Sequence, residues 1–173
     1  MFKPIKSLLF ATNLSENCRP ALEASIAIAA QHSATLVLFH VIDREVPGQI
    51  EDHFISLLGE EKWEAIKKGH EEDAQRALSG KMTTKSIAQS VMQLYGEEAG
   101  IEDLSTHVVW EGVVVGASNI ADAIVEQARH KDCGLIVLGS RKGFLGANAI
   151  GSKMKDVLRK SKIPVMVVPS RSE

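Results

Sequence analysis

The sequence predicts an α/β fold, built as a single open, mostly parallel, five-stranded doubly wound sheet with helices on both faces. Short apolar runs rich in β-branched residues alternate along the chain with segments whose apolar residues recur at helical spacing. A helix that connects two strands returns the chain to the same edge of the sheet, so the strands run parallel, with right-handed crossovers. At 173 residues, with 45% hydrophobic and 24% charged residues, the chain suits one domain over residues 1–173.

The first two strands and the helix between them form a βαβ unit. Ile5–Ala11 is a compact apolar run followed by polar residues, which is typical of the carboxyl end of a strand. Ser15 or Asn17 is expected to cap the next helix, and Pro20 suits its first turn. Apolar residues of this helix recur at i, i+4 and i+7: Leu22, Ile26 and Ala29. Thr35–Ile42, rich in β-branched and aromatic residues, is an interior strand.

A charged segment at about residues 44–105 separates the second strand from the third. Helical patterns are expected over Glu60–Leu78 and Thr83–Tyr95. Gly69 and Gly80 each weaken a continuous helix by about 1 kcal/mol relative to alanine, so we expect two helices or a broken one. The sequence assigns no function to this segment.

The third strand leads into a well-marked helix. Thr106–Trp110 and Val113–Val115 form one β segment, and Gly112 predicts a bulge within it. Gly116–Asn119 supplies a turn and a helix cap. The inward stripe of the helix consists of Ile120, Ala123, Ile124 and Ala128. The helix is expected to end near His130–Lys131, where cations suit the helix dipole.

The last two strands flank a loop punctuated by glycines. Leu135–Leu138 suits a strand buried on both faces, and the helix Ser152–Lys160 leads to a final strand, Val165–Val168, which Pro169 stops. The loop Gly139–Ser152 therefore lies at the carboxyl edge of the sheet, where ligands bind at the point of reversed strand order. The final strand would form a sheet edge, a natural site for pairing with a second copy.

This loop has the features of an anion cradle. Its glycines allow positive φ and a close approach of the backbone to a ligand: Gly139, Gly143, Gly146 and Gly151. Basic residues surround it: Arg141, Lys142, Lys153 and Lys155. Lys153 and Lys155 follow the expected cap at Ser152, where the helix dipole disfavours each cation by ~0.3–1 kcal/mol and a bound anion would offset that cost. A flexible surface loop with solvated lysines is the alternative interpretation.

The sequence resembles the universal stress protein family over nearly the whole chain. Lys6–Ser15 is similar to the opening strand and polar turn of that family, and Leu36–Asp43 to its second strand. Two other stretches resemble the family more specifically. One is Gly116 with the helix that leads to Leu135–Arg141, and the other is the C-terminal part from Gly151–Ser152 to Ile163–Val168.

The resemblance implies an adenine nucleotide, ATP or AMP, as ligand, with magnesium only if the nucleotide carries it. It places the Val41 backbone at the adenine, with core packing as the alternative for Val41 and Leu138. The residues that it assigns to the site are Thr12, Asn13, Val41, Leu138, Gly139, Ser140, Arg141, Gly143, Gly151, Ser152 and Lys153. Thr12 and Asn13 would line the adenine pocket, Gly139 and Ser140 would approach the ribose, and Gly151–Lys153 would meet the phosphates.

The chain departs from the nucleotide-binding members at two places. Their loop has two residues between the first two glycines and nine before the last, whereas three separate Gly139 from Gly143 here, and seven separate Gly143 from Gly151. Asn13 stands where those members usually carry an aspartate, and an amide cannot supply a negative charge to a ribose hydroxyl or a metal.

Composition and residue spacing argue against several other classes of function. A net charge of −2 predicts no nucleic-acid partner, and no apolar run suits a membrane span, so we expect a cytoplasmic protein. Cys18 and Cys133 are expected to be reduced, and the histidines lack metal-ligand spacing, so no metal site is expected. His40 is expected to be packed or hydrogen-bonded, and no motif predicts a catalytic residue.

Two hypotheses for function remain from the sequence. The first is a regulatory stress protein that binds ATP or AMP, with at most slow hydrolysis. The second is a nucleotide-free interaction protein of the same fold, which acts as a homodimer and through partners. The family resemblance implies a homodimer, which we expect to form through the C-terminal edge strand Val165–Val168.

Overall fold

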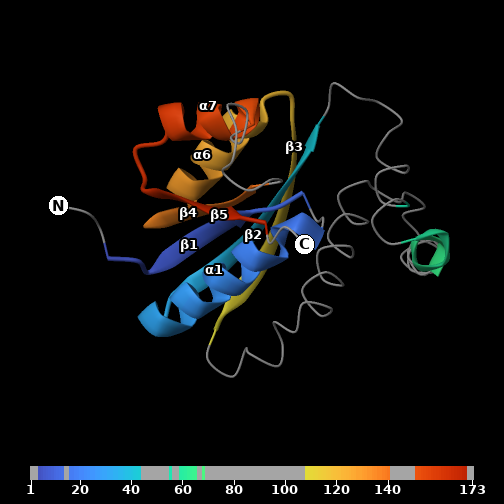
Figure 1. The fold of residues 1–173 in the computed structure, drawn as a ribbon, viewed down its shortest axis with the longest axis horizontal. Coiled ribbons are helices and arrows are strands. Elements are labelled where there is room, and N and C mark those ends of the chain that lie inside the picture. Colours follow the sequence, from blue (N-terminus) through green and yellow to red (C-terminus); the bar gives the residue numbers. More distant parts are fainter. Residues whose placement is uncertain are drawn as a thin grey trace, which may run out of the picture.

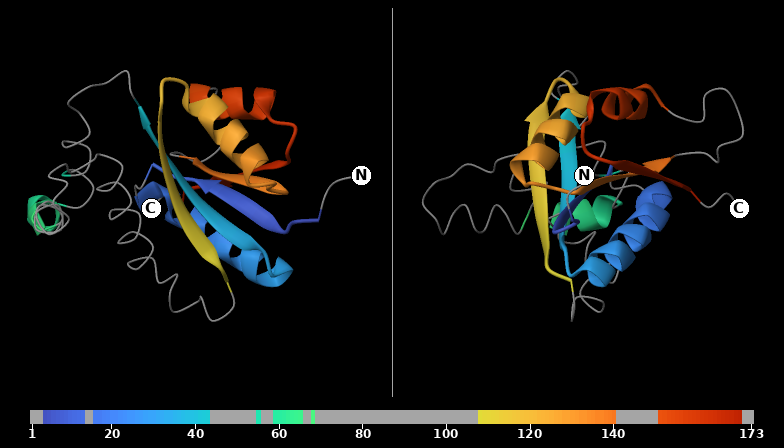
Figure 2. Two further views of the ribbon diagram at one scale, coloured as in Figure 1. Left: turned by 180° about the vertical axis from the view of Figure 1, so that it is seen from behind. Right: turned by 90° about the vertical axis from the view of Figure 1, so that its left-hand side faces the viewer.

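The computed structural model describes residues 4–13, 16–43, 55, 59–65, 68, 108–140 and 151–170. One sheet lies between α1 (Arg19–His32) on one face and the pair α6 (Ile120–His130) and α7 (Ser152–Lys160) on the other (Figures 1 and 2). The sheet consists of five strands: β1 (Ser7–Ala11), β2 (Thr35–Asp43), β3 (Trp110–Ala117), β4 (Leu135–Ser140) and β5 (Val165–Pro169).

The strand order is β3-β2-β1-β4-β5, and every neighbouring pair is parallel. The chain moves outward from β1 through β2 to β3, then crosses back to β4 and continues to β5. The order therefore reverses between β1 and β4, which makes their carboxyl ends the switch point of the sheet. The predicted α/β class, the five strands and the helices on both faces are confirmed.

The two faces of the sheet have separate cores because successive strand residues point to opposite faces. Leu8, Phe10 and Leu36 are buried with the apolar stripe of α1, and Leu9 and Phe39 are buried against α6 and α7. The three residues predicted for the α1 stripe lie in the first core: Leu22, Ile26 and Ala29. Trp63, from the charged middle segment, is also buried there, so it is a core residue.

The bulge predicted in the third strand is wrong. The pairing of β2 with β3 runs one to one from Leu36↔Trp110 to Asp43↔Ala117, and Gly112 simply faces Leu38. Because β3 lies at the edge of the sheet and Gly112 is exposed, a missing side chain there leaves no gap in the core. The expected start of this strand at Thr106 lies outside the described residues.

Both helix starts next to the switch point differ from the sequence expectation. A 3-10 turn, Glu16–Cys18, precedes α1, so Asn17 does not cap it, and Ser15 lies outside the described residues. The N-cap is Cys18, without a side-chain cap bond, and Pro20 lies in the first turn as predicted.

Ser152 is likewise not a cap. It is the first residue of α7, because the Gly151 carbonyl oxygen already accepts from the Lys155 N–H at 3.0 Å and Gly151 takes the N-cap position. The predicted cap of α6 is confirmed, since the Asn119 side chain accepts from the Asp122 N–H at 3.0 Å.

Only fragments of the charged middle segment are described. Residues 55, 60–65 and 68 are helical, in agreement with the start of the helix expected over Glu60–Leu78. The helix expected over Thr83–Tyr95, together with Gly69 and Gly80, lies outside the described residues.

Candidate nucleotide site

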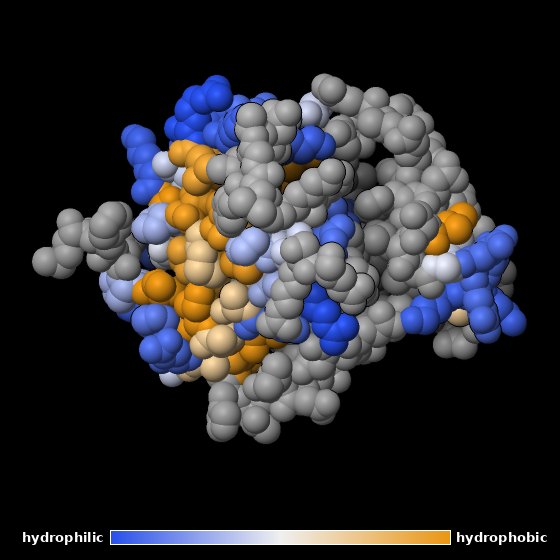
Figure 3. All heavy atoms as spheres, in the orientation of Figure 1, coloured by the Kyte–Doolittle hydropathy of each residue, from blue (hydrophilic) through white to orange (hydrophobic). Residues whose placement is uncertain are grey.

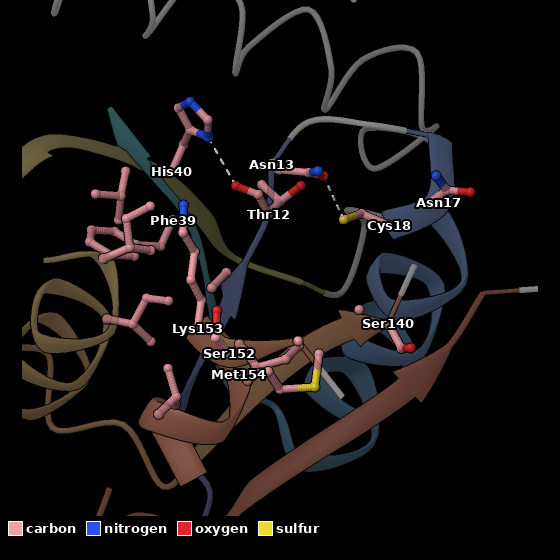
Figure 4. Close-up of a pocket in the computed structure, with 18 residues that line it drawn as sticks. Thr12, Asn13, Asn17, Cys18, Phe39, His40, Ser140, Ser152, Lys153 and Met154 are labelled. Atoms are coloured by element: carbon pink, nitrogen blue, oxygen red, sulfur yellow. Dashed lines mark hydrogen bonds between the residues drawn. The ribbon is translucent and has the colours of Figure 1, made fainter. Parts of the chain in front are cut away.

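A pocket of about 650 Å³ lies at the switch point, over the carboxyl ends of β1, β2 and β4 (Figure 4). It also reaches the start of α1 and the facing sides of α6 and α7. Polar groups come from the strand ends and from the first residues of α7, whereas α6 contributes apolar side chains.

Nine of the residues predicted for the site line this one pocket: Thr12, Asn13, Val41, Leu138, Gly139, Ser140, Gly151, Ser152 and Lys153. The fold thus brings together four separate segments of the sequence. Arg141 and Gly143, also predicted, lie outside the described residues.

Sequence reasoning did not place the other half of the lining in the site. These residues are Ala11, Asn17, Cys18, Phe39, His40, Ile120, Ile124, Met154 and Val157. The helical spacing of Ile120 and Ile124 marked them as inward-facing, but only the packing of α6 against the sheet turns that stripe toward the pocket. His40 carried no sequence signal for a place in the lining.

The pocket has an apolar side built from both the sheet and the helices. Phe39 of β2 and Leu138 of β4 lie on the same face of the sheet. The same apolar surface continues on α6 and α7 with Ile120, Ile124 and Val157. Flat aromatic ligands bind well to such surfaces because burial of apolar area stabilises the complex and no polar group is left unpaired.

The end of β1 is held in place by β2. The Thr12 N–H donates to the Phe39 carbonyl oxygen at 2.9 Å, one residue beyond the end of the strand. The Thr12 carbonyl oxygen accepts from His40 Nδ1, also at 2.9 Å (Figure 4). His40 is only 6% exposed, which confirms that it is a packed and hydrogen-bonded histidine.

A thiol connects the next residue to the start of α1. Cys18 Sγ donates to Asn13 Oδ1 at 3.0 Å (Figure 4), and the Cys18 side chain is buried. A methyl group added at Gly139 would lie 3.4 Å from both Cys18 Sγ and the Cβ of Ala21. The β1 end, the β4 end and the helix start are therefore packed closely together on this side of the pocket.

The start of α7 supplies the positive side of the pocket. Gly151 has φ −61°, an ordinary conformation, so a positive φ is not what makes glycine suitable there. A Cβ at Gly151 would meet no atom of the described residues within 4 Å, which leaves this side of the backbone open to a ligand. Lys153 extends from this helix start across the pocket toward Thr12 and Phe39 (Figure 4). Among the described lining residues, Lys153 is the one with a permanent charge.

Cys133 lies far from this pocket, between α6 and the start of β4. Its Sγ is 3.4 Å from Ser7 Oγ, and burial raises the pKa of the thiol, an effect that this hydrogen bond partly opposes. Cys18 and Cys133 are both free cysteines. A raised pKa keeps Cys133 in its unreactive thiol form.

Within the described ranges, no group of three or more His, Cys, Asp or Glu side chains could hold a metal ion. In that same part of the chain, the helices are too short or too polar to cross a membrane.

Comparison with solved structures supports the fold. A universal stress protein in complex with cAMP is 17% identical to this chain, with a TM-score of 0.60, and the match covers 96% of this chain and 98% of that one. A universal stress protein from Archaeoglobus fulgidus in complex with dAMP is 18% identical, with a TM-score of 0.51, over 95% of this chain and 98% of that one.

A protein of the same family from Burkholderia pseudomallei is 21% identical, with a TM-score of 0.55, over 97% of this chain and 98% of that one. No curated protein sequence matches the chain at a significant level. The model of the universal stress protein family matches residues 4–169. Since this match spans nearly the full length, the chain belongs to the universal stress protein family.

Proposed function

We propose that this protein is a regulatory, cytoplasmic universal stress protein that binds an adenine nucleotide, ATP or AMP, in the pocket at the switch point. The observation that carries the proposal is the composition of that pocket. It joins an apolar surface to a helix start from which a lysine extends across the pocket.

Each part of a nucleotide has a matching part of the pocket. The adenine would lie against Phe39 and Ile124, beside the backbone of Val41. The ribose would lie at Gly139 and Ser140, at the end of β4. The phosphates would meet the first amides of α7, where the helix dipole and the Lys153 ammonium favour an anion.

Two proteins with the same fold support this choice of ligand, since one was solved with cAMP and the other with dAMP. Both ligands contain adenine, a sugar and one phosphate group. The pocket of this chain lies at the switch point of its own sheet, which is where ligands of doubly wound sheets bind.

Hydrolysis is expected to be slow at most, and magnesium is expected only with the nucleotide. The Asn13 side chain is an amide, and its oxygen accepts from the Cys18 thiol. A neutral amide is a poor ligand for a hard cation compared with a carboxylate. We assign no catalytic residue.

The first test is mass spectrometry of nucleotide released from the purified protein, followed by calorimetric titration with ATP and AMP. A double variant, Gly151→Val with Ser152→Ala, should abolish binding, because the valine side chain would occupy the space that the phosphates need. No atom of the described residues lies within 4 Å of the Cβ position at Gly151, so the fold should persist. Unchanged affinity in the variant would show that the phosphates lie elsewhere.

A second candidate is a nucleotide-free interaction protein that acts as a homodimer. The edge strand β5 favours it, because Val165–Val168 are all only partly buried. Figure 3 shows apolar surface between α7 and α1, on the face where β5 lies in Figure 1. Absence of released nucleotide together with absence of calorimetric heat would favour this candidate.

A further inference from the structure

The backbone amides of β2 alternate between its two neighbouring strands. Thr35 donates its N–H to the Lys6 carbonyl oxygen at 3.0 Å, on the β1 side, and Leu36 donates to the Val109 carbonyl oxygen at 2.9 Å, on the β3 side. Because this alternation continues along a parallel strand, the odd-numbered amides of β2 face β1. The N–H of Val41 therefore points past the end of β1, at the pocket that Val41 lines.

In a regular parallel ladder, the acceptor for the Val41 N–H would be the Thr12 carbonyl oxygen. The Thr12 N–H already donates to the Phe39 oxygen at 2.9 Å, and the evenly spaced pattern continues from there to Val41. Instead, the Thr12 oxygen accepts from His40 Nδ1 at 2.9 Å. In the part of the chain that the structure describes, the Val41 N–H makes no hydrogen bond to the Thr12 oxygen.

We propose that His40 is a positioning residue for the nucleotide: its imidazole orients the Thr12 carbonyl oxygen away from the Val41 N–H and so keeps that N–H available to the base. The inference rests on the proposed function, because it assigns a role within the same pocket. The His40 side chain ends the β1–β2 ladder one bond early. A ligand can then take the next position in the ladder.

The chemistry of the two partners fits this role. A carbonyl oxygen only accepts, so Nδ1 of His40 must carry the hydrogen, as it does in one neutral tautomer and in the charged imidazolium. In a strand, the N–H and C=O of Val41 point the same way, so together they offer a donor beside an acceptor. Adenine offers the complementary pair, with a ring-nitrogen acceptor beside its amino donor.

Two variants separate this role from simple packing. In His40→Leu, the bulk remains but the donor is lost, so the Thr12 oxygen is no longer held by the imidazole and can turn toward the Val41 N–H. In His40→Asn, the side-chain amide nitrogen replaces Nδ1 as the donor. Loss of one hydrogen bond to the base should weaken AMP binding about tenfold in His40→Leu, and His40→Asn should stay within about twofold of the wild type. Equal affinities of the two variants would overturn the inference.

The decisive measurement is hydrogen exchange at the Val41 amide, followed by NMR. In the free wild-type protein this amide should exchange faster than the Phe39 amide, its neighbour on the same side of β2. AMP should slow its exchange. In free His40→Leu protein it should already be slow. Slow exchange in the free wild type would refute the role of His40.

This outcome is independent of the proposed function. If the protein binds no AMP, the nucleotide assignment fails, whereas the exchange of the Val41 amide in free wild-type and His40→Leu protein still decides what His40 does.

Discussion

The two cysteines lie at opposite ends of the sheet. Cys18 lines the pocket at the carboxyl ends of the strands, and Cys133 is buried beside Ser7 at the amino ends. Burial favours the neutral thiol of Cys133 over the thiolate, so its pKa is raised in the folded state.

The raised pKa makes the stability of the protein dependent on pH through Cys133. A group whose pKa is higher when folded contributes its full stabilisation below the unfolded-state pKa, near the ordinary thiol value of 9.0, and loses it as pH rises through the folded-state pKa. The free energy of unfolding should therefore fall above pH 9.0, and fall less in a Cys133→Ala variant. Urea denaturation on both sides of that pH measures the difference. Parallel pH profiles of the two proteins would contradict the prediction.

Residue identities predicted the pocket better than they predicted its hydrogen bonds. Thr12, Asn13 and Gly139 follow apolar runs, so their place at the strand ends could be inferred from the sequence. The bond from His40 to the Thr12 oxygen spans 28 positions and depends on a single side-chain rotamer. No periodicity encodes such a contact, and it could not be predicted.

Among the secondary-structure elements, α7 begins with two cations at the edge of the pocket. Lys153 and Lys155 lie in its first turn, and no acidic residue accompanies them there. Both lysines meet the positive end of the same helix dipole, but only Lys153 lines the pocket.

These two lysines form a matched pair for a test. Lys153→Gln should weaken ATP binding about tenfold, as expected for the loss of a charge-assisted hydrogen bond to phosphate. Lys155→Gln should leave the affinity for ATP within about twofold of the wild type. Each of the two variants should stabilise the free protein by ~0.3–1 kcal/mol, because each removes a cation from the helix N-terminus. Calorimetry and urea denaturation of both variants give the answer. Equal losses of affinity in the two variants would mean that both lysines attract the phosphates only by long-range electrostatics, and that Lys153 makes no specific contact.

The elements themselves were predictable wherever burial fixed them. β2 and β4 are interior strands, and their apolar runs marked them to within two residues of the observed ends. The regular pairing of β3 was not predicted. An edge strand tolerates an exposed glycine at position 112, and in the sequence this glycine suggested a bulge. The α1 start was missed because a 3-10 turn, Glu16–Cys18, takes the place of a capping side chain.

At the scale of the whole molecule, strand order determines where the pocket forms. The alternation of strands and helices predicted the parallel sheet and its switch point. The apolar wall from α6 and α7 could not be predicted in the same way, because it depends on which face each helix covers. Ile120 and Val157 meet at the pocket only after the sheet has brought their helices side by side.

The same topology leaves β5 at an edge, where its outward amides can pair with a second copy. The Ser170 N–H donates to the Ser140 oxygen at 3.1 Å, and Ile136 donates to Pro164 at 2.9 Å, so even-numbered amides of β5 face β4. The N–H of Val167 then points away from the sheet. Together with its partly buried apolar side chains, this edge suits strand pairing between protomers.

We expect sedimentation at micromolar concentration to report a homodimer that Val167→Pro dissociates. Proline removes the outward N–H, fixes φ near −65° and is tolerated on edge strands, while the ladder between β4 and β5 keeps all of its bonds. Val167→Thr is the matched control, because it keeps both the N–H and the β-branched shape, and it should remain dimeric. A wild-type protein that sediments as a monomer would contradict the predicted homodimer. A dimer that persists in a folded Val167→Pro variant would show that the interface does not involve β5.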